Sequence, residues 1–171
     1  MRPGGRRYNG SMTNPYAKFL GGRDVRRTIA ATPARLAGLA EQLGAEGLER
    51  STAPGKWRAR EILCHLADCE VAFAFRLRQA LAEPRHVIQP FDQEAWAKPY
   101  PALGAQAALD AFTAVRGWNL ALLAAAPAEA WSKVVSHPER GDMTFQTVVE
   151  TMAGHDLNHI AQLESIVGQA G

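Results

Sequence analysis

The stretch from Thr144 to Val167, TFQTVVETMAGHDLNHIAQLESIV, decides the fold class of this 171-residue chain. Its inward-facing positions recur every three or four residues, which is the period of one face of an α-helix. These positions are Val148, Met152, His155, His159, Leu163 and Ile166. Thr144 is a suitable N-cap, and Gly168 follows the last apolar position. The stretch therefore predicts one long amphipathic helix whose apolar face is interrupted by two histidines.

Three further segments show the same helical period. The first is predicted to begin at Thr32-Pro33 and to end at Gly44, the second covers about residues 58–81, and the third covers about residues 103–126. Residues 83–102 contain four prolines and are expected to form a long ordered loop between the second and third helices. The sequence thus predicts an all-α four-helix bundle with one long loop.

No segment shows a convincing strand pattern. Residues 136–143, SHPERGDM, are interpreted as another loop ahead of the last helix. His137 lies in this loop and His86 lies in the long one, and both are expected to be exposed.

The composition excludes several classes of protein. Apolar residues make up 47% of the chain and charged residues 21%, which is too apolar for a disordered chain. No apolar stretch approaches the roughly 20 residues needed to cross a bilayer, and no secretory signal is evident, so we expect a cytoplasmic protein with no membrane segment. Cys64 and Cys69 are too few for a disulfide scaffold and are expected to be packing residues.

Basic residues gather at the N-terminus. Residues 1–27 carry seven basic side chains against Asp24 alone, whereas the rest of the chain is mildly acidic. We expect residues 1–22 to be a flexible basic extension and residues 23–171 to be the helical domain. The arm is sparse and contains glycines, so contact with nucleic acid is the weaker interpretation.

The histidines of the last helix predict a metal site. His155 and His159 are four residues apart, which places their Cβ atoms about 5–6 Å from each other on one helix face. His65 borders the apolar face of the second helix and can supply a third imidazole in an antiparallel bundle. Three histidines leave coordination positions open on a divalent transition metal such as Zn, Ni or Fe, as in catalytic sites. The alternative is that they are hydrogen-bonded core histidines, and spacing alone does not decide between the two.

The segment His155-Asp156-Leu157-Asn158-His159 is also comparable with the H-E-x-x-H motif of metalloproteases. We discount this comparison because Asp156 is one methylene shorter than the glutamate base. Ligating histidines normally donate their other ring N–H to a carboxylate or a carbonyl group. The candidate acceptors are Asp68, Glu70, Glu150 and Asp156.

Five motifs in this order and spacing resemble the DinB superfamily over about residues 25–168. They are Gly55-Lys56-Trp57, the segment EILCHLA at 61–67, the segment FDQEAW at 91–96, His137-Pro138-Glu139, and the segment HDLNHIAQL at 155–163. The resemblance implies an up-down-down-up four-helix bundle, often dimeric, with a divalent metal held by three histidines. Carried over by position, these are His65, His155 and His159.

The resemblance also implies activities. Members of the family include metal-dependent thiol transferases, which add low-molecular-weight thiols to electrophiles, and related hydrolases and isomerases. We therefore expect a metal-dependent enzyme acting on a small molecule, with a low-molecular-weight thiol as a candidate substrate, assembled as a homodimer. The loop carrying Asp92, Trp96 and Tyr100 is expected to shape its pocket. The alternative is a stress-related protein that binds a metal or a ligand without catalysis.

Overall fold

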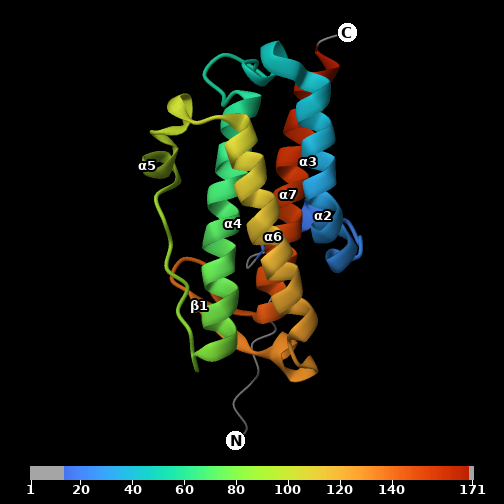
Figure 1. Ribbon diagram of the computed structural model, residues 1–171. Coiled ribbons are helices and arrows are strands. Elements are labelled where there is room, and N and C mark those ends of the chain that lie inside the picture. Colours follow the sequence, from blue (N-terminus) through green and yellow to red (C-terminus); the bar gives the residue numbers. More distant parts are fainter. Residues whose placement is uncertain (1–13, 170–171) are drawn as a thin grey trace, which may run out of the picture.

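Four long helices lie side by side in the computed structural model, which describes residues 14–169 (Figure 1). They are α3 (Val25–Leu48), α4 (Ala59–Ala82), α6 (Ala105–Ala125) and α7 (Phe145–Gly168). Helices α3 and α7 run in one direction, and α4 and α6 run in the other. The predicted all-α bundle with up-down-down-up order is confirmed. None of the helices within 14–169 is long and apolar enough to cross a membrane.

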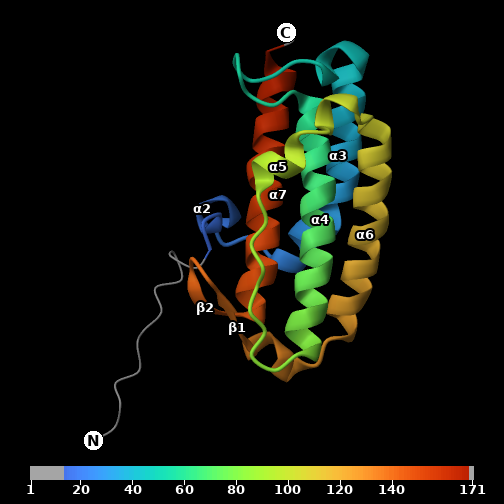
Figure 2. The same cartoon turned by 90° about the vertical axis from the view of Figure 1, so that its left-hand side faces the viewer.

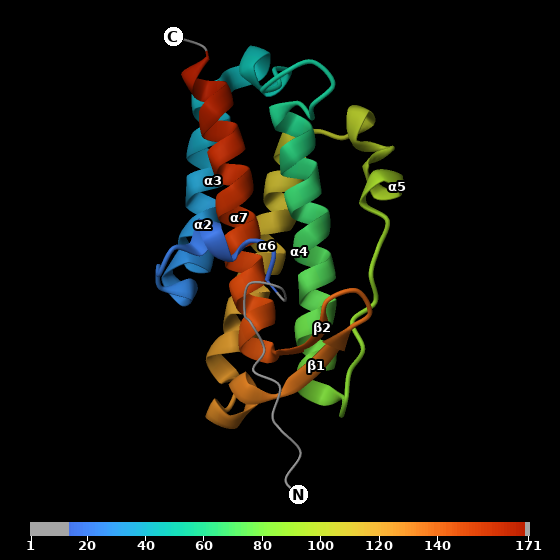
Figure 3. The ribbon, with the colours of Figure 1, turned by 180° about the vertical axis from the view of Figure 1, so that it is seen from behind.

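Short elements decorate the ends and one side of the bundle. They are α2 (Ala17–Leu20), α5 (Gln93–Ala97), the 3-10 helices η1 (Tyr100–Ala102) and η2 (Ala128–Ser132), and the strands β1 (Val134–His137) and β2 (Gly141–Thr144). Helix α2 packs against α7 (Figure 3). The extension predicted over residues 1–22 lies mostly outside the described residues, and its described part includes this contact.

The long connection between α4 and α6 follows from their directions. The two helices pack against each other and run parallel, so the chain must return along the whole length of α4. A 24-residue helix is about 36 Å long, which a short loop cannot span. The connection runs back along the side formed by α4 and α7, and α5 lies on it (Figure 2). The long loop is therefore confirmed, although it contains two short helical turns.

The helix start predicted at Thr32 is wrong. Helix α3 begins at Val25, where the side chain of Asp24 accepts a hydrogen bond from the Arg27 backbone N–H at 2.8 Å. Pro33 therefore lies inside the helix, where its missing N–H leaves the Ile29 carbonyl without its usual partner. The Arg116 guanidinium donates to that carbonyl at 2.9 Å, so a contact from another helix makes the internal proline acceptable.

The prediction that no strand precedes the last helix is also wrong. Strands β1 and β2 form an antiparallel hairpin in which Val134 pairs with Thr144 and His137 pairs with Gly141. The backbone around Val87, after α4, adds to its edge, since the Ile88 N–H donates to the Ser136 carbonyl at 2.8 Å. Strands of four residues are too short for their alternation to stand out in a sequence.

Two apolar clusters fill the bundle, one toward each end. One contains Leu36 of α3, Phe112 of α6 and Leu163 of α7, and the other contains Ile29 of α3, Leu77 of α4 and Met152 of α7. Between them lies a layer of buried polar side chains: Thr32, His65, Glu70, Arg116, Asn119, His155, Asp156 and His159. This polar layer is the part of the core where function is to be sought.

Arg116 is the centre of one half of the polar layer. Its side chain is fully buried on α6, and it donates to Glu70 of α4 at 2.6 and 2.9 Å. It also donates to Asp156 of α7 at 2.7 and 3.2 Å, and to the Ile29 carbonyl of α3 at 2.9 Å. One guanidinium thus joins α6 to each of the other three long helices.

Two neutral side chains complete this network. Asn119 donates to Glu70 at 2.7 Å, and Thr32 donates to Asp156 at 2.9 Å. Burial raises the pKa of Asp156, while the charge and hydrogen bonds of Arg116 oppose that rise. Arg116 itself is desolvated by burial, but the charges of the two carboxylates outweigh this effect and raise its pKa. The network therefore places two carboxylates around Arg116 in the core, and the partly buried Arg78 joins it by donating to Asn119 Oδ1 at 2.8 Å.

We predict that Arg116→Met destabilises the protein by about 3–5 kcal/mol, because it leaves two buried carboxylates without their counter-charge. Urea unfolding followed by circular dichroism measures this loss. The matched control is Arg35→Met, since Arg35 pairs with Glu164 on the surface and such pairs contribute at most about 1 kcal/mol. A loss below 1 kcal/mol for Arg116→Met, or equal losses for the two variants, contradicts the central place of Arg116.

Candidate metal centre and adjoining cavity

The structure brings the three predicted histidines together. His65 lies on α4, and His155 and His159 lie on successive turns of α7. The ring centroids of His65 and His155 are 5.1 Å apart, those of His65 and His159 are 4.7 Å apart, and those of His155 and His159 are 4.5 Å apart. All three side chains are buried, and the Nε2 atoms of His65 and His155 are separated by 3.0 Å.

Burial keeps these imidazoles neutral. It lowers the pKa of His65 to about 3 and the pKa of His159 to about 4. The pKa of His155 falls well below its ordinary value, first through burial and then through the charges of the other two histidines. The neutral ring is the form that ligates metals, so at neutral pH all three histidines are in the form that can bind a metal ion.

The second ring nitrogens of the histidines have unequal partners. The Nδ1–H of His159 donates to Gln162 Oε1 at 3.0 Å, which leaves its Nε2 lone pair free. The Nδ1 atom of His155 is buried and has no hydrogen-bond partner within residues 14–169. A buried ring nitrogen without a hydrogen-bond partner destabilises the fold unless a bound water, ion or ligand interacts with the ring.

None of the four carboxylates considered as acceptors binds a histidine of this cluster. Asp68 accepts from the Tyr100 hydroxyl at 2.8 Å, and Glu150 accepts from the Gln146 side chain at 2.8 Å. Glu70 and Asp156 are bound to Arg116, as described above. The sequence signal for Gln162 is its spacing of three residues from His159 on the same helix.

Cys69 joins the cluster, contrary to its interpretation as a packing residue alone. Its Sγ atom lies 3.5 Å from His65 Nε2, and ligand atoms of His65, Cys69 and His155 all lie within 4.8 Å of one another. Burial raises the pKa of the Cys69 thiol, so the free side chain is protonated. Its position four residues after His65 is the spacing that places both side chains on one helix face.

Aromatic rings cover the histidines. Tyr16 packs edge-on against His155 with centroids 5.1 Å apart, and Trp57 packs against His65 with centroids 4.8 Å apart. The Tyr16 backbone lies directly on α7 at Gly154, where a Cβ atom would come within 2.6 Å of the Tyr16 carbonyl oxygen. The segment before α2 thus shields the cluster from solvent, which sequence inspection did not predict.

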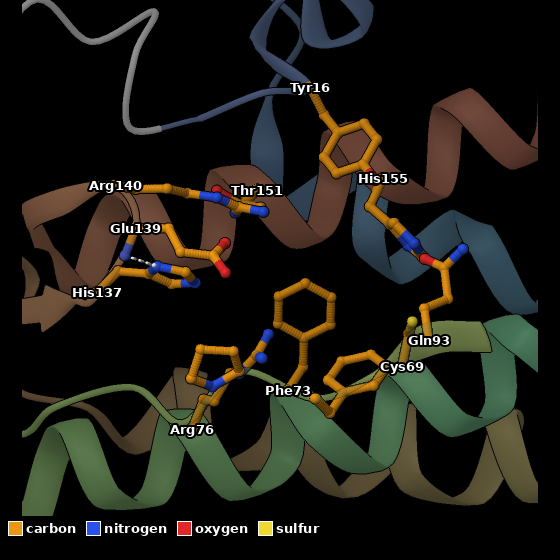
Figure 4. A pocket seen from close by; sticks show the side chains of 12 residues that line it. Tyr16, Cys69, Phe73, Arg76, Gln93, His137, Glu139, Arg140, Thr151 and His155 are labelled. Atoms are coloured by element: carbon orange, nitrogen blue, oxygen red, sulfur yellow. Dashed lines mark hydrogen bonds between the residues drawn. The ribbon is translucent and has the colours of Figure 1, made fainter. Parts of the chain in front are cut away.

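A cavity of about 170 Å³ opens beside His155 and Cys69 (Figure 4). It lies between α4, α7, the β1–β2 turn and the long loop, and Tyr16 lines it as well. Its lining residues are Tyr16, Cys69, Phe73, Arg76, Pro90, Phe91, Gln93, His137, Glu139, Arg140, Thr151 and His155. A second cavity, of about 510 Å³, reaches His159 and shares Tyr16 and Gln93 with the first.

The long loop lines both cavities, but not through the three residues expected. Asp92 caps α5 by accepting from the Ala95 N–H at 3.0 Å, and Trp96 packs on Phe91 with centroids 4.5 Å apart. Tyr100 is buried in the apolar cluster. Pro90, Phe91 and Gln93 are the loop residues that face the cavity beside the histidines.

His86 and His137 are not exposed, as had been expected, but buried. Both belong to the segments that pair at the edge of the hairpin, where the Ser136 N–H donates to the His86 carbonyl at 2.9 Å. Pairing of the two loops is a tertiary contact, so neither loop revealed it alone. His137 faces the cavity beside His155.

Comparison with known proteins identifies relatives. The model of the DinB superfamily matches residues 28–163. An Oceanobacillus iheyensis protein named "Putative metal-dependent hydrolase" is 29% identical over 126 residues, covering 72% of this chain and 73% of that protein. A protein of the same description from Bacillus mycoides is 26% identical over 140 residues, covering 81% of this chain and 80% of that protein.

Solved structures share the fold. YfiT from Bacillus subtilis, described as a probable metal-dependent hydrolase with an unusual four-helix bundle topology, has a TM-score of 0.80 at 20% identity, covering 94% of this chain and 98% of that chain. A mycothiol-dependent maleylpyruvate isomerase has a TM-score of 0.64 at 14% identity, covering 84% of this chain and 62% of that chain. Identities this low show a common bundle topology.

We predict that the stability of the metal-free protein falls as the pH is lowered from 7 to 5. The unfolded histidines take up protons with a pKa near 6.5, whereas the buried ones stay neutral until the pH is far lower. Through these three histidines the unfolded state binds up to three more protons, which contributes up to about 4 kcal/mol per pH unit to the slope below pH 6. Burial also lowers the pKa of His137, which adds to the slope. Urea unfolding at several pH values in the presence of a chelator measures it. In His155→Ala the slope should shrink by up to about 1.4 kcal/mol per pH unit, and an unchanged slope would contradict the burial of His155 as a neutral ring.

We predict that Gly154→Ala displaces the segment that covers the histidines, since the new methyl group meets the Tyr16 backbone. Hydrogen exchange should rise in residues 14–24 while the rest of α7 keeps its protection. Gly38→Ala on α3 is the matched control, because its Cβ has open space and alanine favours the helix by up to about 1 kcal/mol. Unchanged exchange in Gly154→Ala would show that Tyr16 does not pack on α7.

Proposed function

Because this chain belongs to the DinB superfamily, we propose that it is a metal-dependent enzyme acting on a small molecule, of hydrolase or thiol transferase type. The relatives named as metal-dependent hydrolases support the first reaction type. The likeness to a mycothiol-dependent isomerase supports a low-molecular-weight thiol as substrate or co-substrate.

The observation that carries the proposal is the convergence of three buried, neutral imidazoles, His65, His155 and His159. Buried histidines without a ligand normally find hydrogen-bond partners, but here two of the rings meet mainly each other. The Nε2 atoms of His65 and His155, which lie 3.0 Å apart, and the free Nε2 lone pair of His159 fit a set of metal ligands. The donor set of imidazoles suits a divalent transition metal such as Zn, Ni or Fe.

Each residue of the site then has a role. His65, His155 and His159 hold the ion, and Gln162 orients the ring of His159. Cys69 is the alternative ligand, because its sulfur lies beside His65 and His155. A divalent transition metal, when bound, lowers the pKa of a coordinated water or thiol so that a nucleophile is available near neutral pH. Tyr16 and Trp57 exclude bulk water from the histidines.

We predict about one transition metal ion per chain in the purified protein, measured by inductively coupled plasma mass spectrometry. His155→Ala should lose the metal, whereas His86→Gln, which changes a buried histidine outside the cluster, should keep it. Adding Zn or Ni to the stripped protein should raise its melting temperature, because binding to the folded state alone stabilises it. Absence of metal together with no rise in melting temperature contradicts the proposal.

The part played by Cys69 is decided by a matched pair of cysteine variants. Cys69→Ala and Cys64→Ala each remove a buried thiol from α4, but only Cys69 lies beside the histidines. If the three histidines suffice, both variants keep stoichiometric metal. If Cys69 is a ligand, only Cys69→Ala loses affinity, and cobalt loaded into the unaltered protein shows a sulfur-to-metal charge-transfer band.

Catalysis is tested separately from metal binding. Consumption of several low-molecular-weight thiols by a generic electrophile, and hydrolysis of small esters and amides, should depend on the metal and vanish in His155→Ala. Tight metal binding with no turnover in these assays favours the alternative of a non-catalytic metal-binding or ligand-binding protein. The homodimer, the cytoplasmic location and the link to stress stay predictions from the sequence.

A further inference from the structure

The cavity beside the histidines has a basic end. His155 and Cys69 lie at one end, and Arg76, His137 and Arg140 lie toward the other (Figure 4). The three basic side chains come from different elements, since Arg76 is on α4, His137 ends β1, and Arg140 lies in the turn that follows.

The guanidinium groups of Arg76 and Arg140 have N–H donors that are available to bind a ligand. Within residues 14–169, neither Arg76 nor Arg140 forms an ion pair with a carboxylate. Arg76 donates to the Gln89 carbonyl at 3.2 Å, and its guanidinium lies near the rings of Phe73 and Phe91 at 5.9 and 5.5 Å. A guanidinium carries five N–H donors, so most of those of Arg76 are free to bind a ligand.

His137 supplies a third donor. Its Nδ1 atom accepts from the Glu139 backbone N–H at 3.2 Å, so the neutral ring carries its proton on Nε2. Burial, followed by the charges of Arg140 and Arg76, lowers the pKa of His137 and keeps the ring neutral. The side chain is only 6% exposed, and no partner for Nε2 is present within the described chain.

One carboxylate also lines the cavity. Glu139 is exposed and lies near His137 and Arg140, but forms no ion pair within 4 Å in the part of the chain described. Two guanidiniums against one carboxylate leave the cavity with a net positive charge. Glu139 therefore weakens the attraction for an anion without cancelling it.

The remaining walls are apolar and the space is small. Phe73, Phe91 and Tyr16 line the cavity, and Phe73 lies between the basic end and His155. Its volume of about 170 Å³ is below the roughly 300–1,000 Å³ of sites for drug-sized ligands. The matching ligand is a compact molecule with a carboxylate at one end and an apolar body.

We propose that this cavity binds a small organic acid, whose carboxylate accepts hydrogen bonds from Arg76, Arg140 and the Nε2–H of His137. The planar fork of a guanidinium matches a carboxylate, and the aromatic walls favour an organic acid over inorganic phosphate. The apolar body then extends toward His155. Only this last step rests on the proposed function, because it places the reacting group at the metal ligands.

The test is the binding of phenylacetate, measured by isothermal titration calorimetry on the full chain stripped of metal. Its uncharged analogue phenylacetamide should bind at least tenfold more weakly, since charge-assisted hydrogen bonds are lost. Affinity should fall as salt is raised. Equal affinity for the two compounds, or tighter binding of inorganic phosphate, overturns the proposal.

Variants localise the binding. Arg76→Gln and Arg140→Gln should each weaken phenylacetate binding about tenfold, whereas Arg50→Gln, which removes an arginine just after the end of α3, should not change it. Glu139→Gln should strengthen binding severalfold, because it removes the one opposing charge. A gain of affinity cannot come from a damaged fold, so Glu139→Gln tests the site even if Arg76→Gln is unstable. Arg140→Gln does the same, because Arg140 is exposed and its replacement leaves the core intact.

Failure of this proposal is distinguishable from failure of the metal proposal. If the chain holds no metal but binds phenylacetate through Arg76 and Arg140, the acid site stands and the metal site falls. If phenylacetate binds only after metal is restored, and Arg140→Gln and Glu139→Gln have no effect, the acid is held by the metal and the arginine site is overturned.

Discussion

The buried guanidinium of Arg116 is the interaction on which the bundle depends. It joins Glu70, Asp156 and the Ile29 carbonyl, so a single side chain of α6 reaches the other three long helices. Taking these charges out of water costs several kcal/mol per ion, and only full satisfaction of their hydrogen bonds offsets the cost. A shift of α4, α6 or α7 along its axis would leave a buried charge unpaired, and a shift of α3 would leave the Ile29 carbonyl without its donor. The network therefore sets the axial register of all four helices.

That register also sets the candidate metal centre. His155 precedes Asp156 on α7, and Cys69 precedes Glu70 on α4, so aligning the two carboxylates on Arg116 also brings the histidines of both helices to one level. Successive side chains on a helix diverge by about 100°, which directs the carboxylates to the bundle centre and the imidazoles to the groove between α4 and α7. Stability and candidate chemistry thus share one polar layer between two apolar clusters.

The surroundings of the histidines follow from the topology. Because α4 and α6 are parallel neighbours, the long connection must return along the bundle, and it places Phe91 and Gln93 over the groove. The hairpin before α7, which pairs with the start of the long connection, brings His137 and Arg140 to the same groove. Tyr16 closes it from the segment before α2, where Gly154 allows the two backbones to touch. The cavity is therefore assembled from segments far apart in the chain.

The sequence by itself determined the four long helices, because a period of 3.6 residues is visible within each segment. It also determined that His65, His155 and His159 lie on or beside the apolar faces of two of these helices. It did not reveal Arg116, since a lone arginine in α6 is normally a surface residue and only partners on three other helices explain its burial. It misplaced the start of α3 because the hydrogen bond that satisfies the Ile29 carbonyl comes from Arg116. The hairpin, the burial of His137 and the place of Cys69 beside His65 were likewise decided by tertiary structure, since each depends on contacts between segments that local patterns do not encode.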